Sequence, residues 1–461
     1  MIESSPIKKI HFAGIGGSGM SGIAEVLHNM GFQVSGSDLA ENDTVRRLRA
    51  LGMRIAIGHA AANVGGAEAL VYSSAVREDN VEVLEALQRK LPVIPRAEML
   101  AELMRMKFSL AVAGTHGKTT TTSMLAAILT QAGLDPTYVV GGRLKVEGSG
   151  AKLGSSRYLV AEADESDGSF LTLFPTIAVL TNVENDHLEF YGSMKRLVQA
   201  FRQFADKVPF YGAVVLNRDD ARLRRILPQL RKKVIPYGFA AGCDVRAVRP
   251  RADAFAAAYD LELRGLPAGR VRLGVGGRHN VANSLAAIAA ALEVGVGLET
   301  VRASLERFTL PERRFQVLHA GADLLVVDDY AHHPSEIKAT LRMLRGARRR
   351  RLLAVFQPHR FTRLQRLMGA FATAFRLADV LVIAPLYTAN QAEIAGVSSR
   401  ALADAVRASG QENVQLLDSF AGIREFLRAE LRPGDGLVFL SAGNLTRLAH
   451  EFAAELEGGR P

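Results

Sequence analysis

The sequence predicts an α/β protein built from three domains. At 461 residues the chain is long enough for about three domains of ordinary size. In its first and last thirds, short apolar runs alternate with helix-like runs, a pattern typical of parallel sheets covered by helices. Between these regions, residues 113–120 (AGTHGKTT) form a glycine-rich turn that joins a strand-like run to a helix-like run. We therefore expect domains at residues 1–107, 108–310 and 311–461.

The composition is that of an ordinary water-soluble globular protein. Apolar residues make up 48% of the chain and charged residues 23%. Cys243 is the single cysteine, which excludes an internal disulfide and a cysteine-based zinc site and suits a reducing compartment. No run approaches the roughly 18 uninterrupted apolar residues of a membrane span, and no apolar leader precedes the first strand. We expect a cytoplasmic protein that does not enter a membrane.

The net charge of +10 raises the question of nucleic-acid binding. The densest basic cluster, Arg345 with residues 348–351, lies between a helix-like and a strand-like run and contains no interleaved aromatic residues. We interpret it as a solvated surface and expect no nucleic-acid partner. A positive potential also suits a protein that handles anionic nucleotides.

The first domain reads as a Rossmann-like sheet with a pyrophosphate-binding turn. Its expected strands lie at residues 7–13, 33–37, 69–72 and 92–94, with a helix at residues 18–30. The turn at residues 14–19 reads GIGGSG, and Asp38 follows it by about twenty residues, as in dinucleotide-binding loops. NAD and a UDP-sugar both contain a pyrophosphate, so the pattern does not distinguish between them. A tight turn without a ligand is the alternative.

The turn at residues 113–120 has the chemistry of a phosphate-binding loop. It follows the apolar run 108–112 and opens the helix-like run 121–131. Glycine amides can surround phosphate oxygens, Lys118 adds a mobile positive charge, and Thr119 offers a hydroxyl to Mg²⁺. Only Thr115 and His116 separate the first glycine from the Gly-Lys pair, whereas the standard pattern G-x-x-x-x-G-K has a longer spacer. The alternative is an ordinary glycine-rich turn that begins a helix.

Acidic residues follow two further strands of the central domain. The strand-like run 157–161 leads into residues 162–167 (EADESD), and the run 177–181 leads into residues 182–187 (NVENDH). Carboxylates gathered at one edge of a sheet repel each other, and bound Mg²⁺ is the usual compensation. Two solvated acidic loops are the alternative.

A small flank and an asparagine pair complete the central domain. Residues 243–275 alternate loosely between apolar and polar residues, which predicts short antiparallel strands. Asn280 and Asn283 open the next helix and are spaced to share one face, where side-chain amides could read an adenine edge. Helix capping by Asn280 is the alternative, and the residues by themselves favour it.

The third domain reads as a second Rossmann-like sheet. Strand-like runs at residues 324–327, 352–356, 380–384 and 436–440 alternate with helix-like stretches. Residues 328–334 (DDYAHHP) and 357–363 (QPHRFTR) follow two of these strands, at the edge where ligands collect in open parallel sheets. The planar forks of Arg360 and Arg363 suit a carboxylate, although isolated arginines more often lie on a bare surface.

Taken together, these motifs resemble the Mur ligases, the ATP-dependent amide-forming enzymes of bacterial peptidoglycan synthesis. Residues 114–119 (GTHGKT) match the shortened phosphate loop of that family. The alanine-adding members are similar at residues 11–22 (HFAGIGGSGMSG), 161–167 (AEADESD), 328–334 and 356–363 (FQPHRFTR). The resemblance covers essentially the whole chain.

The resemblance implies specific ligands and roles. The ligands are ATP, Mg²⁺ or Mn²⁺, UDP-N-acetylmuramic acid and L-alanine, bound by a monomer or homodimer. The implied ATP-binding residues are Gly114, Thr115, His116, Gly117, Lys118, Thr119, Thr120, Asn280, Asn283, Arg314 and Asp329. The implied metal ligands are Thr119, Glu162 and His187, with Glu165 as the alternative to Glu162. The residues implied for the UDP portion are Gly14, Gly16, Gly17, Ser18, Gly19, Ser37, Asp38, Ser73 and Ser74. Those implied for L-alanine are Tyr330, His332, Arg360 and Arg363, and the implied catalytic set is Lys118, Glu162, His187, His332 and Arg360.

The implied chemistry activates a carboxylate with the γ-phosphoryl group of ATP before an amine attacks it, and we expect the third domain to close onto the second first. One position departs from the family. Several sister ligases carry a carbamoylated lysine about fifteen residues after the metal-binding histidine, where this chain has Arg202. Either Arg202 supplies the positive charge, or Lys195 or Lys207 takes the role.

Three other functions compete with this interpretation. A ligase that attaches a recycled tripeptide uses the same chemistry, but residues 356–363 argue against it. An NAD-dependent oxidoreductase leaves the second phosphate loop and its acids unexplained. A nucleotide-gated binding protein has no need of two acidic clusters.

Overall fold

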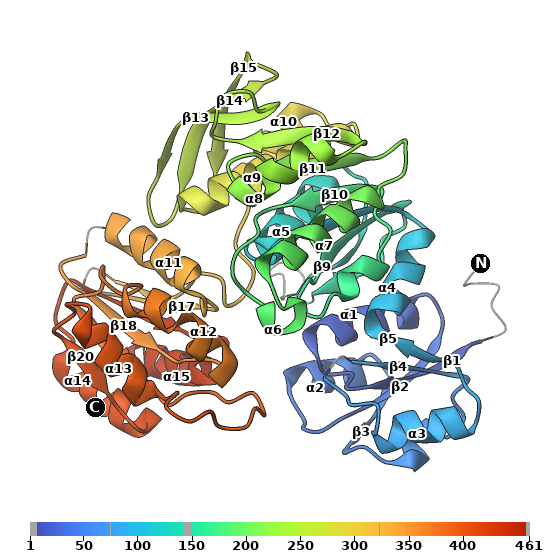
Figure 1. The fold of residues 1–461 in the computed structure, drawn as a ribbon, viewed down its shortest axis with the longest axis horizontal. Coiled ribbons are helices and arrows are strands. Elements are labelled where there is room, and N and C mark those ends of the chain that lie inside the picture. Colours follow the sequence, from blue (N-terminus) through green and yellow to red (C-terminus); the bar gives the residue numbers. More distant parts are fainter. Residues whose placement is uncertain (1–6, 74, 142–149, 322, 348, 458–461) are drawn as a thin grey trace. The chain divides into compact units, whose positions relative to one another are not determined.

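The computed structural model describes residues 7–73, 75–141, 150–321, 323–347 and 349–457 (Figure 1). Contacts between residues divide the chain into two compact units. Unit 1 comprises Met1–Val248, Asp260–Val271 and Ala282–Phe308, and unit 2 comprises Arg249–Tyr259, Arg272–Val281 and Thr309–Pro461. Three sheets, two in the N-terminal two thirds of the chain and one in the C-terminal third, give the predicted α/β class with three domains.

The first sheet has the order β3-β2-β1-β4-β5, and all its pairs are parallel. Its strands are β1 (Lys9–Ala13), β2 (Gln33–Asp38), β3 (Arg54–Ile57), β4 (Ala69–Tyr72) and β5 (Val93–Pro95). The helices between them are α1 (Ser18–Asn29), α2 (Asp43–Ala50), the 3-10 helix η1 (Ala61–Val64) and α3 (Val81–Gln88), and α4 (Arg96–Arg105) follows β5. The chain order reverses between β1 and β4, and ligands of such sheets bind at that switch point.

The second sheet has the order β15-β14-β13-β12-β11-β10-β6-β9-β7-β8. Its strands are β6 (Phe108–Ala113), β7 (Thr137–Val139), β8 (Ala151–Lys152), β9 (Tyr158–Ala163), β10 (Ile177–Leu180), β11 (Ala213–Asn217), β12 (Lys233–Gly238), β13 (Val245–Ala252), β14 (Ala257–Leu263) and β15 (Leu266–Leu273). Its helices are α5 (Lys118–Gln131), η2 (Ser169–Thr172), α6 (Leu188–Tyr191), α7 (Met194–Asp206), α8 (Ala221–Ile226), η3 (Leu227–Gln229), α9 (Arg278–Glu293) and α10 (Leu298–Arg307).

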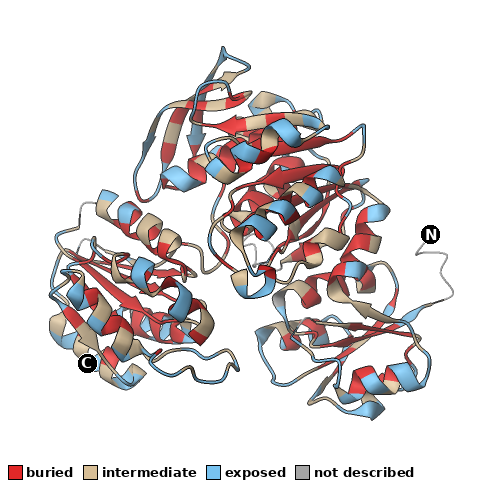
Figure 2. Ribbon diagram, viewed as in Figure 1, coloured by how far each residue is buried: buried red, intermediate tan, exposed pale blue. Residues whose placement is uncertain are grey.

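Strand β6 lies inside this sheet, and most residues of β6 and of the helix α5 that follows it are buried. Residues 109–113 of β6 and residues 119–126 of α5 are all buried, as Figure 2 shows for the strands and central helices. A strand buried on both faces reads as a continuous apolar run, which is why β6 was predictable. Four consecutive threonines, residues 119–122, are nevertheless buried in α5. Thr122 and Ser123 donate their hydroxyls to main-chain carbonyls four residues earlier, and Thr119 donates to Oε2 of Glu162.

The third sheet has the order β16-β17-β21-β18-β19-β20, with β16 antiparallel to β17 and the other pairs parallel. Its strands are β16 (Gln316–Ala320), β17 (Leu324–Asp329), β18 (Leu352–Phe356), β19 (Val380–Ile383), β20 (Val414–Leu416) and β21 (Asp435–Leu440). Its helices are α11 (Pro334–Gly346), α12 (Phe361–Ala372), α13 (Ser399–Ala408), α14 (Phe420–Glu430) and α15 (Leu445–Glu457).

The expected strands are all present, with shifts of one or two residues at their ends. The helix expected at residues 121–131 begins three residues earlier, at Lys118. Within the expected antiparallel flank, β14 and β15 are joined by Arg264 and Gly265 alone, and both residues have positive φ (48° and 81°), as a two-residue hairpin requires. Among the described residues, no helix combines the length and apolarity needed to cross a bilayer.

Candidate active site

The first glycine loop lies at the switch point of the N-terminal sheet. Gly14 has φ +77°, and a Cβ there would lie 3.2 Å from the Cβ of Ser73, which follows β4. The amide of Gly16 donates to Oδ2 of Asp38 at 2.8 Å. The structure therefore brings together the predicted Gly14, Gly16, Asp38 and Ser73. Gly17 lies in the same turn and caps α1, and Gly19 lies in its first turn.

Two predicted residues of this loop region differ from simple ligand contacts. Ser37 is fully buried, and its hydroxyl donates to Oε2 of Glu82 at 2.5 Å. Its carbonyl accepts hydrogen bonds from the amides of Gly14 and Ile15 at 2.9 and 3.0 Å, so the main chain of Ser37 holds the start of the glycine loop in place. Ser74 lies outside the described residues, and for Ser18 the structure describes only the main chain, as the first residue of α1.

The second glycine loop is held in shape by the residues that follow β10. Gly114 has φ +148°, and a Cβ there would lie 1.8 Å from Oγ1 of Thr181. The hydroxyl of Thr181 donates to the carbonyl of His116 at 2.7 Å, and the amide of His116 donates to Oδ1 of Asn182 at 2.9 Å. The amide of Glu184 donates to Oγ1 of Thr115 at 2.9 Å. Neighbouring β10 thus fixes the main chain of the loop, which leaves Gly117, Lys118 and Thr119 to begin α5.

Lys118 is half-buried among carboxylates. Its ammonium donates to the carbonyl of Gly114 and to Oε2 of Glu165, each at 2.7 Å. Burial lowers the pKa of Lys118, but attraction to Glu165, Asp164 and Glu162 outweighs burial and holds that pKa above its usual range. Burial raises the pKa of Glu165, although Lys118 opposes the rise. The pair supplies a fixed cation at the start of α5.

Thr119 and Glu162 form the part of the site that fits a divalent metal. The hydroxyl of Thr119 donates to Oε2 of Glu162 at 3.0 Å, and the same oxygen accepts from the amide of Gly141 at 2.9 Å. Hydroxyl and carboxylate oxygens are the ligands that Mg²⁺ prefers. Glu165, the alternative ligand, is instead engaged by Lys118. The donor set therefore fits Mg²⁺ at Thr119 and Glu162.

His187 stands beside the acids but makes its own contacts. It has φ +56° and is the N-cap residue before α6, and its Nε2 lies 3.5 Å from Oδ2 of Asp186. Burial raises the pKa of Asp164, but Lys118, with smaller contributions from Arg96 and His187, outweighs burial and lowers that pKa. Tyr191, one turn later, donates its hydroxyl to the carbonyl of Glu165 at 2.5 Å. The second metal site that we expect at His187 stays a prediction.

The asparagine pair divides between two roles. Asn283 is buried, and a Cβ on Gly117 would lie 2.5 Å from its Oδ1, so its amide lies against the phosphate loop. Asn280 is also buried, and its Nδ2 donates to the carbonyl of Gly276 at 2.7 Å. The Asn280 side chain thus donates to a carbonyl of the preceding turn, whereas the side chain of a capping residue would accept a hydrogen bond from an amide of the helix. Thr120, the last loop residue of the predicted set, is buried in α5.

Unit 2 gathers its predicted residues at the carboxyl ends of β17 and β18. The guanidinium of Arg314 lies 5.0 Å from the ring centre of Tyr330, and its charge also acts on Asp329. Asp329 is buried and accepts a hydrogen bond from the hydroxyl of Thr340. Burial raises the pKa of Asp329 to about 6, with the Thr340 bond and Arg314 opposing.

Three of the four residues expected to receive an amino acid are linked through His359 in a chain of contacts. Tyr330 and His332 meet edge to face at 5.3 Å between ring centres, and His332 lies 5.9 Å from His359. Arg363 is mostly buried, with Nη1 3.1 Å from Nδ1 of His359. Arg360 takes φ +69° at the start of α12, a strained backbone for a non-glycine residue.

Several residues of these sites were not singled out by the sequence. They are Thr181, Asn182, Glu82, His59, Arg96 and Tyr387, which stacks on His359 at 5.5 Å. Among them, only Asn182 had a signal in the sequence, because it stands in the motif of residues 182–187.

Two of the residues considered for the role of the carbamoylated lysine make other contacts. Arg202 donates to Oε1 of Gln229 at 2.9 Å, and Nζ of Lys207 lies 4.3 Å from the ring centre of Phe174. Which residue takes the role stays a prediction.

Three family models match the chain in succession. Residues 9–108 match the Mur ligase family catalytic domain, residues 112–291 the Mur ligase middle domain, and residues 313–443 the Mur ligase glutamate ligase domain. The chain belongs to the Mur ligase family. The expected resemblance is thereby confirmed, and the shortened phosphate loop of this Mur ligase lies at the start of the match to the middle domain.

Named relatives refine the position of this Mur ligase. It is 50% identical over 452 residues, 98% of this chain and 99% of the relative, to a UDP-N-acetylmuramate–L-alanine ligase of Trichlorobacter lovleyi. It is 49% identical over 98% of this chain and 99% of the relative to the protein of the same name from Geobacter sulfurreducens. A crystal structure of UDP-N-acetylmuramate–alanine ligase from Thermotoga maritima superimposes with TM-score 0.85 at 28% identity, covering 98% of this chain and all of that one. A murein peptide ligase from Psychrobacter arcticus, with the same coverage, gives TM-score 0.73 at 26% identity.

Proposed function

We propose that this Mur ligase joins L-alanine to the carboxylate of UDP-N-acetylmuramic acid, with conversion of ATP to ADP and phosphate, in bacterial peptidoglycan precursor synthesis. The observation that carries the proposal is the identity of about half of all residues, along nearly the whole chain, with ligases named for that reaction. The protein would act in the cytoplasm as a monomer or homodimer.

A carboxylate is a poor acyl donor because its leaving group would be oxide. The muramic acid carboxylate therefore takes the γ-phosphoryl group of ATP first, and ADP leaves. Lys118, fixed by Glu165 and the carbonyl of Gly114, neutralises charge as the phosphoryl group moves. Mg²⁺, when bound at Thr119 and Glu162, would add positive charge beside the same phosphates. Asn283, against Gly117, is placed for the nucleotide.

The amine of L-alanine then attacks the acyl phosphate, an amide bond forms, and phosphate leaves. Arg360 and Arg363 would hold the amino acid's carboxylate, because a guanidinium fork matches two oxygens. The contacts among Tyr330, His332, His359 and Arg363 support this role, since they hold the buried Arg363 in one orientation.

A phosphate-release assay tests the proposal. Purified protein with Mg-ATP should release phosphate only when UDP-N-acetylmuramic acid and L-alanine are both present. Replacing L-alanine with the tripeptide that recycling ligases use serves as the matched control for the related activity. The proposal would be wrong if phosphate were released with the tripeptide but not with L-alanine, if the protein turned over NADH, or if no mixture released phosphate.

A further inference from the structure

A buried carboxylate lies beneath the predicted UDP edge of the N-terminal sheet. Glu82, in the first turn of α3, is fully buried. Its Oε2 accepts from the hydroxyl of Ser37 at 2.5 Å and lies 3.1 Å from Nδ1 of His59. Its Oε1 accepts from Nδ2 of Asn63 at 2.6 Å and from the amide of Ala60 at 3.2 Å. Both oxygens of the carboxylate are therefore used.

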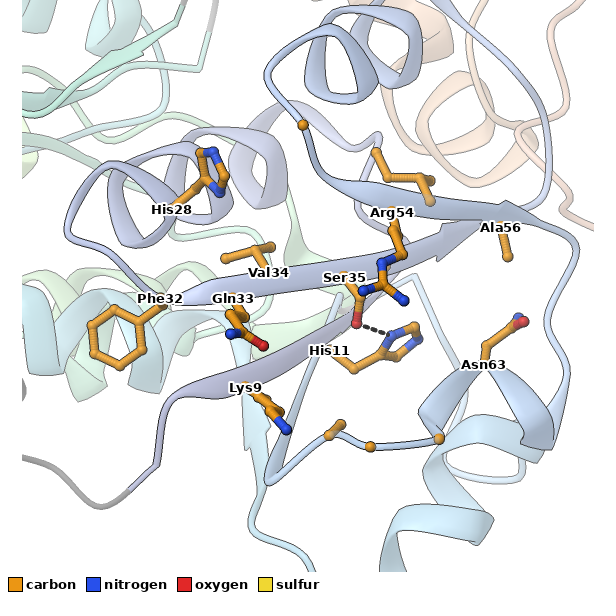
Figure 3. A pocket seen from close by; sticks show the side chains of 16 residues that line it. Lys9, His11, His28, Phe32, Gln33, Val34, Ser35, Arg54, Ala56 and Asn63 are labelled. Atoms are coloured by element: carbon orange, nitrogen blue, oxygen red, sulfur yellow. Dashed lines mark hydrogen bonds between the residues drawn. The ribbon is translucent and has the colours of Figure 1, made fainter.

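A second imidazole approaches Glu82 from the strand β1. Nε2 of His11 lies 3.5 Å from Oε2 of Glu82. Figure 3 shows the other ring nitrogen, Nδ1, hydrogen-bonded to the hydroxyl of Ser35 at 3.0 Å. Burial alone would raise the pKa of Glu82, but the contacts with His11, Ser37 and Asn63 outweigh burial and lower the pKa to about 2. The carboxylate is thus charged at neutral pH, and a buried charge is costly unless such partners hold it.

Glu82 and its partners His11, His59, Ser37 and Asn63 form a cluster. This cluster lies between a hollow and the edge of the sheet where UDP is predicted to bind. His11 and Asn63 line a hollow of about 680 Å³ (Figure 3). Lys9, Gln33 and Arg54 also line it, and they are the first residues of β1, β2 and β3. The residues predicted to hold UDP follow the opposite ends of these strands. The hollow is therefore not the predicted UDP site.

On the UDP side, Glu82 reaches the glycine loop through Ser37. The hydroxyl of Ser37 is bonded to Glu82, and its carbonyl accepts from the amides of Gly14 and Ile15. The orientation of Ser37 therefore sets the first two residues of the loop. Neither Ser37 nor Glu82 is exposed, so neither side chain touches a ligand in this arrangement.

A second connection from Glu82 to the same edge of the sheet runs through its contact with His59. His59 follows β3 by two residues, and Gly58 before it donates its amide to the carbonyl of Asp38 at 2.8 Å. Because Nδ1 of His59 faces the carboxylate, the tautomer that donates from Nδ1 is favoured, and Nε2 is left on the far side of the ring. The side chain of His59 keeps 12% exposure, whereas that of Glu82 has none.

We propose that Glu82 is a positioning residue for the uridine diphosphate end of the substrate, which it serves through Ser37 and His59. The proposal rests on the proposed function, in that the loop of residues 14–19 must bind UDP. A merely structural role would lower stability without separating one substrate from the others, so the test depends on that separation.

Glu82→Gln keeps the shape of the side chain and removes its charge. We expect the Michaelis constant for UDP-N-acetylmuramic acid to rise by about ten-fold or more, as for other groups that orient a binding residue. The Michaelis constants for ATP and L-alanine and the value of kcat should stay within about two-fold. Glu85→Gln, on the same helix and outside the cluster, is the matched control and should change none of these constants. An unchanged constant for the UDP-sugar, or an equal rise in all three, overturns the proposal.

Direct titration of the full chain with UDP, without ATP or L-alanine, separates this proposal from the proposed function. Wild-type protein that binds UDP but makes no product refutes the function only, whereas equal UDP affinity in wild type and Glu82→Gln refutes the role of Glu82. If Glu82→Gln does not fold, His59→Gln takes its place. Weaker UDP binding by about ten-fold with unchanged ATP binding then supports the role, and equal UDP binding overturns it.

Discussion

The two glycine-rich loops of unit 1 occupy equivalent places but differ in charge. Each follows a buried parallel strand and leads into a helix. The loop of residues 14–19 contains no lysine, and its Gly16 amide is already bonded to the carboxylate of Asp38. The loop of residues 114–119 contains Lys118, which is held among three acids. Main-chain amides are enough to hold a pyrophosphate that does not react, whereas phosphoryl transfer needs a fixed cation and acids for a metal.

Removing the lysine gives the largest expected effect. Lys118→Ala should lower kcat by about a thousand-fold or more, because a preorganised positive charge at the transferring group is lost. Binding of UDP, measured by titration, should stay as in wild type. The change also leaves Glu165 buried without its partner, at a cost of several kcal/mol.

The double variant Lys118→Ala/Glu165→Gln separates the two consequences. It should regain stability in thermal unfolding and remain inactive. If the double variant recovers activity together with stability, then Lys118 acts only as a structural partner of Glu165, and the contrast between the loops disappears.

A methyl group added to each loop tests how rigid each one is. A Cβ at Gly114 would lie 1.8 Å from Thr181 Oγ1 and 3.1 Å from the amide of Asn182, whereas a Cβ at Gly19 would meet the movable end of Arg96. Gly114→Ala should lower the free energy of unfolding by about 2–4 kcal/mol. Gly19→Ala should cost less than about 1 kcal/mol, since a flexible side chain can move aside.

Gly133→Ala is the control for backbone strain alone, because Gly133 has φ +72° and open space where a Cβ would lie. It should cost about 1 kcal/mol in denaturant unfolding. Equal losses for Gly114→Ala and Gly133→Ala would mean that the contact with Thr181 does not constrain the loop.

Acid unfolding distinguishes the buried carboxylates behind the two loops. The pKa of Glu82 is lowered to about 2, so its contribution to stability is present above its unfolded value near 4.5 and is lost as the pH falls toward 2. The pKa of Glu165 is raised, so Glu165 contributes no such loss in that window. Between pH 6 and pH 3, wild type should lose about 1–3 kcal/mol more stability than Glu82→Gln. Parallel pH profiles for the two proteins contradict this assignment.

The sequence predicted the loops and strand ends because their signals are local. The glycines, the Gly-Lys-Thr run and the acids at residues 162–167 stand next to the strands that position them. The supports of these loops are distant in the chain. Thr181 lies 65 residues from its partner His116, and Glu82 lies 45 residues from Ser37. In the sequence, Glu82 is only one acid among several polar residues of a short helix, so nothing marked it as buried.

The contacts of Asn283 and of Ser37 also depend on distant parts of the chain, which the sequence does not reveal. The spacing of Asn280 and Asn283 predicted one shared face, but the structure ties Asn280 to Gly276 and sets Asn283 against Gly117, contacts that depend on how the turn before α9 folds. Ser37 was expected at the UDP portion because the family resemblance implied it. The structure shows its hydroxyl turned into the core, because alternating residues of a strand face opposite sides and Ser37 falls on the side of Glu82.

The smallest expected effect on activity concerns Arg96 of α4, whose guanidinium lies beside Gly19 of the first loop. Arg96 lies so close to Gly19 that a Cβ there would be 2.9 Å from Nη1, and its Nη2 is 3.9 Å from Oδ2 of Asp164. Arg96→Gln should raise the Michaelis constant for the UDP-sugar by about ten-fold, equivalent to about 1.4 kcal/mol, because the first loop loses the guanidinium that lies beside Gly19. Stability should change by less than about 1 kcal/mol, as the long contact with the half-exposed Asp164 contributes little. Arg105→Gln, on the exposed end of the same helix, is the matched control. The opposite result is that Arg96→Gln and Asp164→Asn both raise the Michaelis constant for ATP and leave that for the UDP-sugar unchanged. Arg96 would then serve the acids near the second loop, and the first loop would hold its ligand with main-chain amides alone.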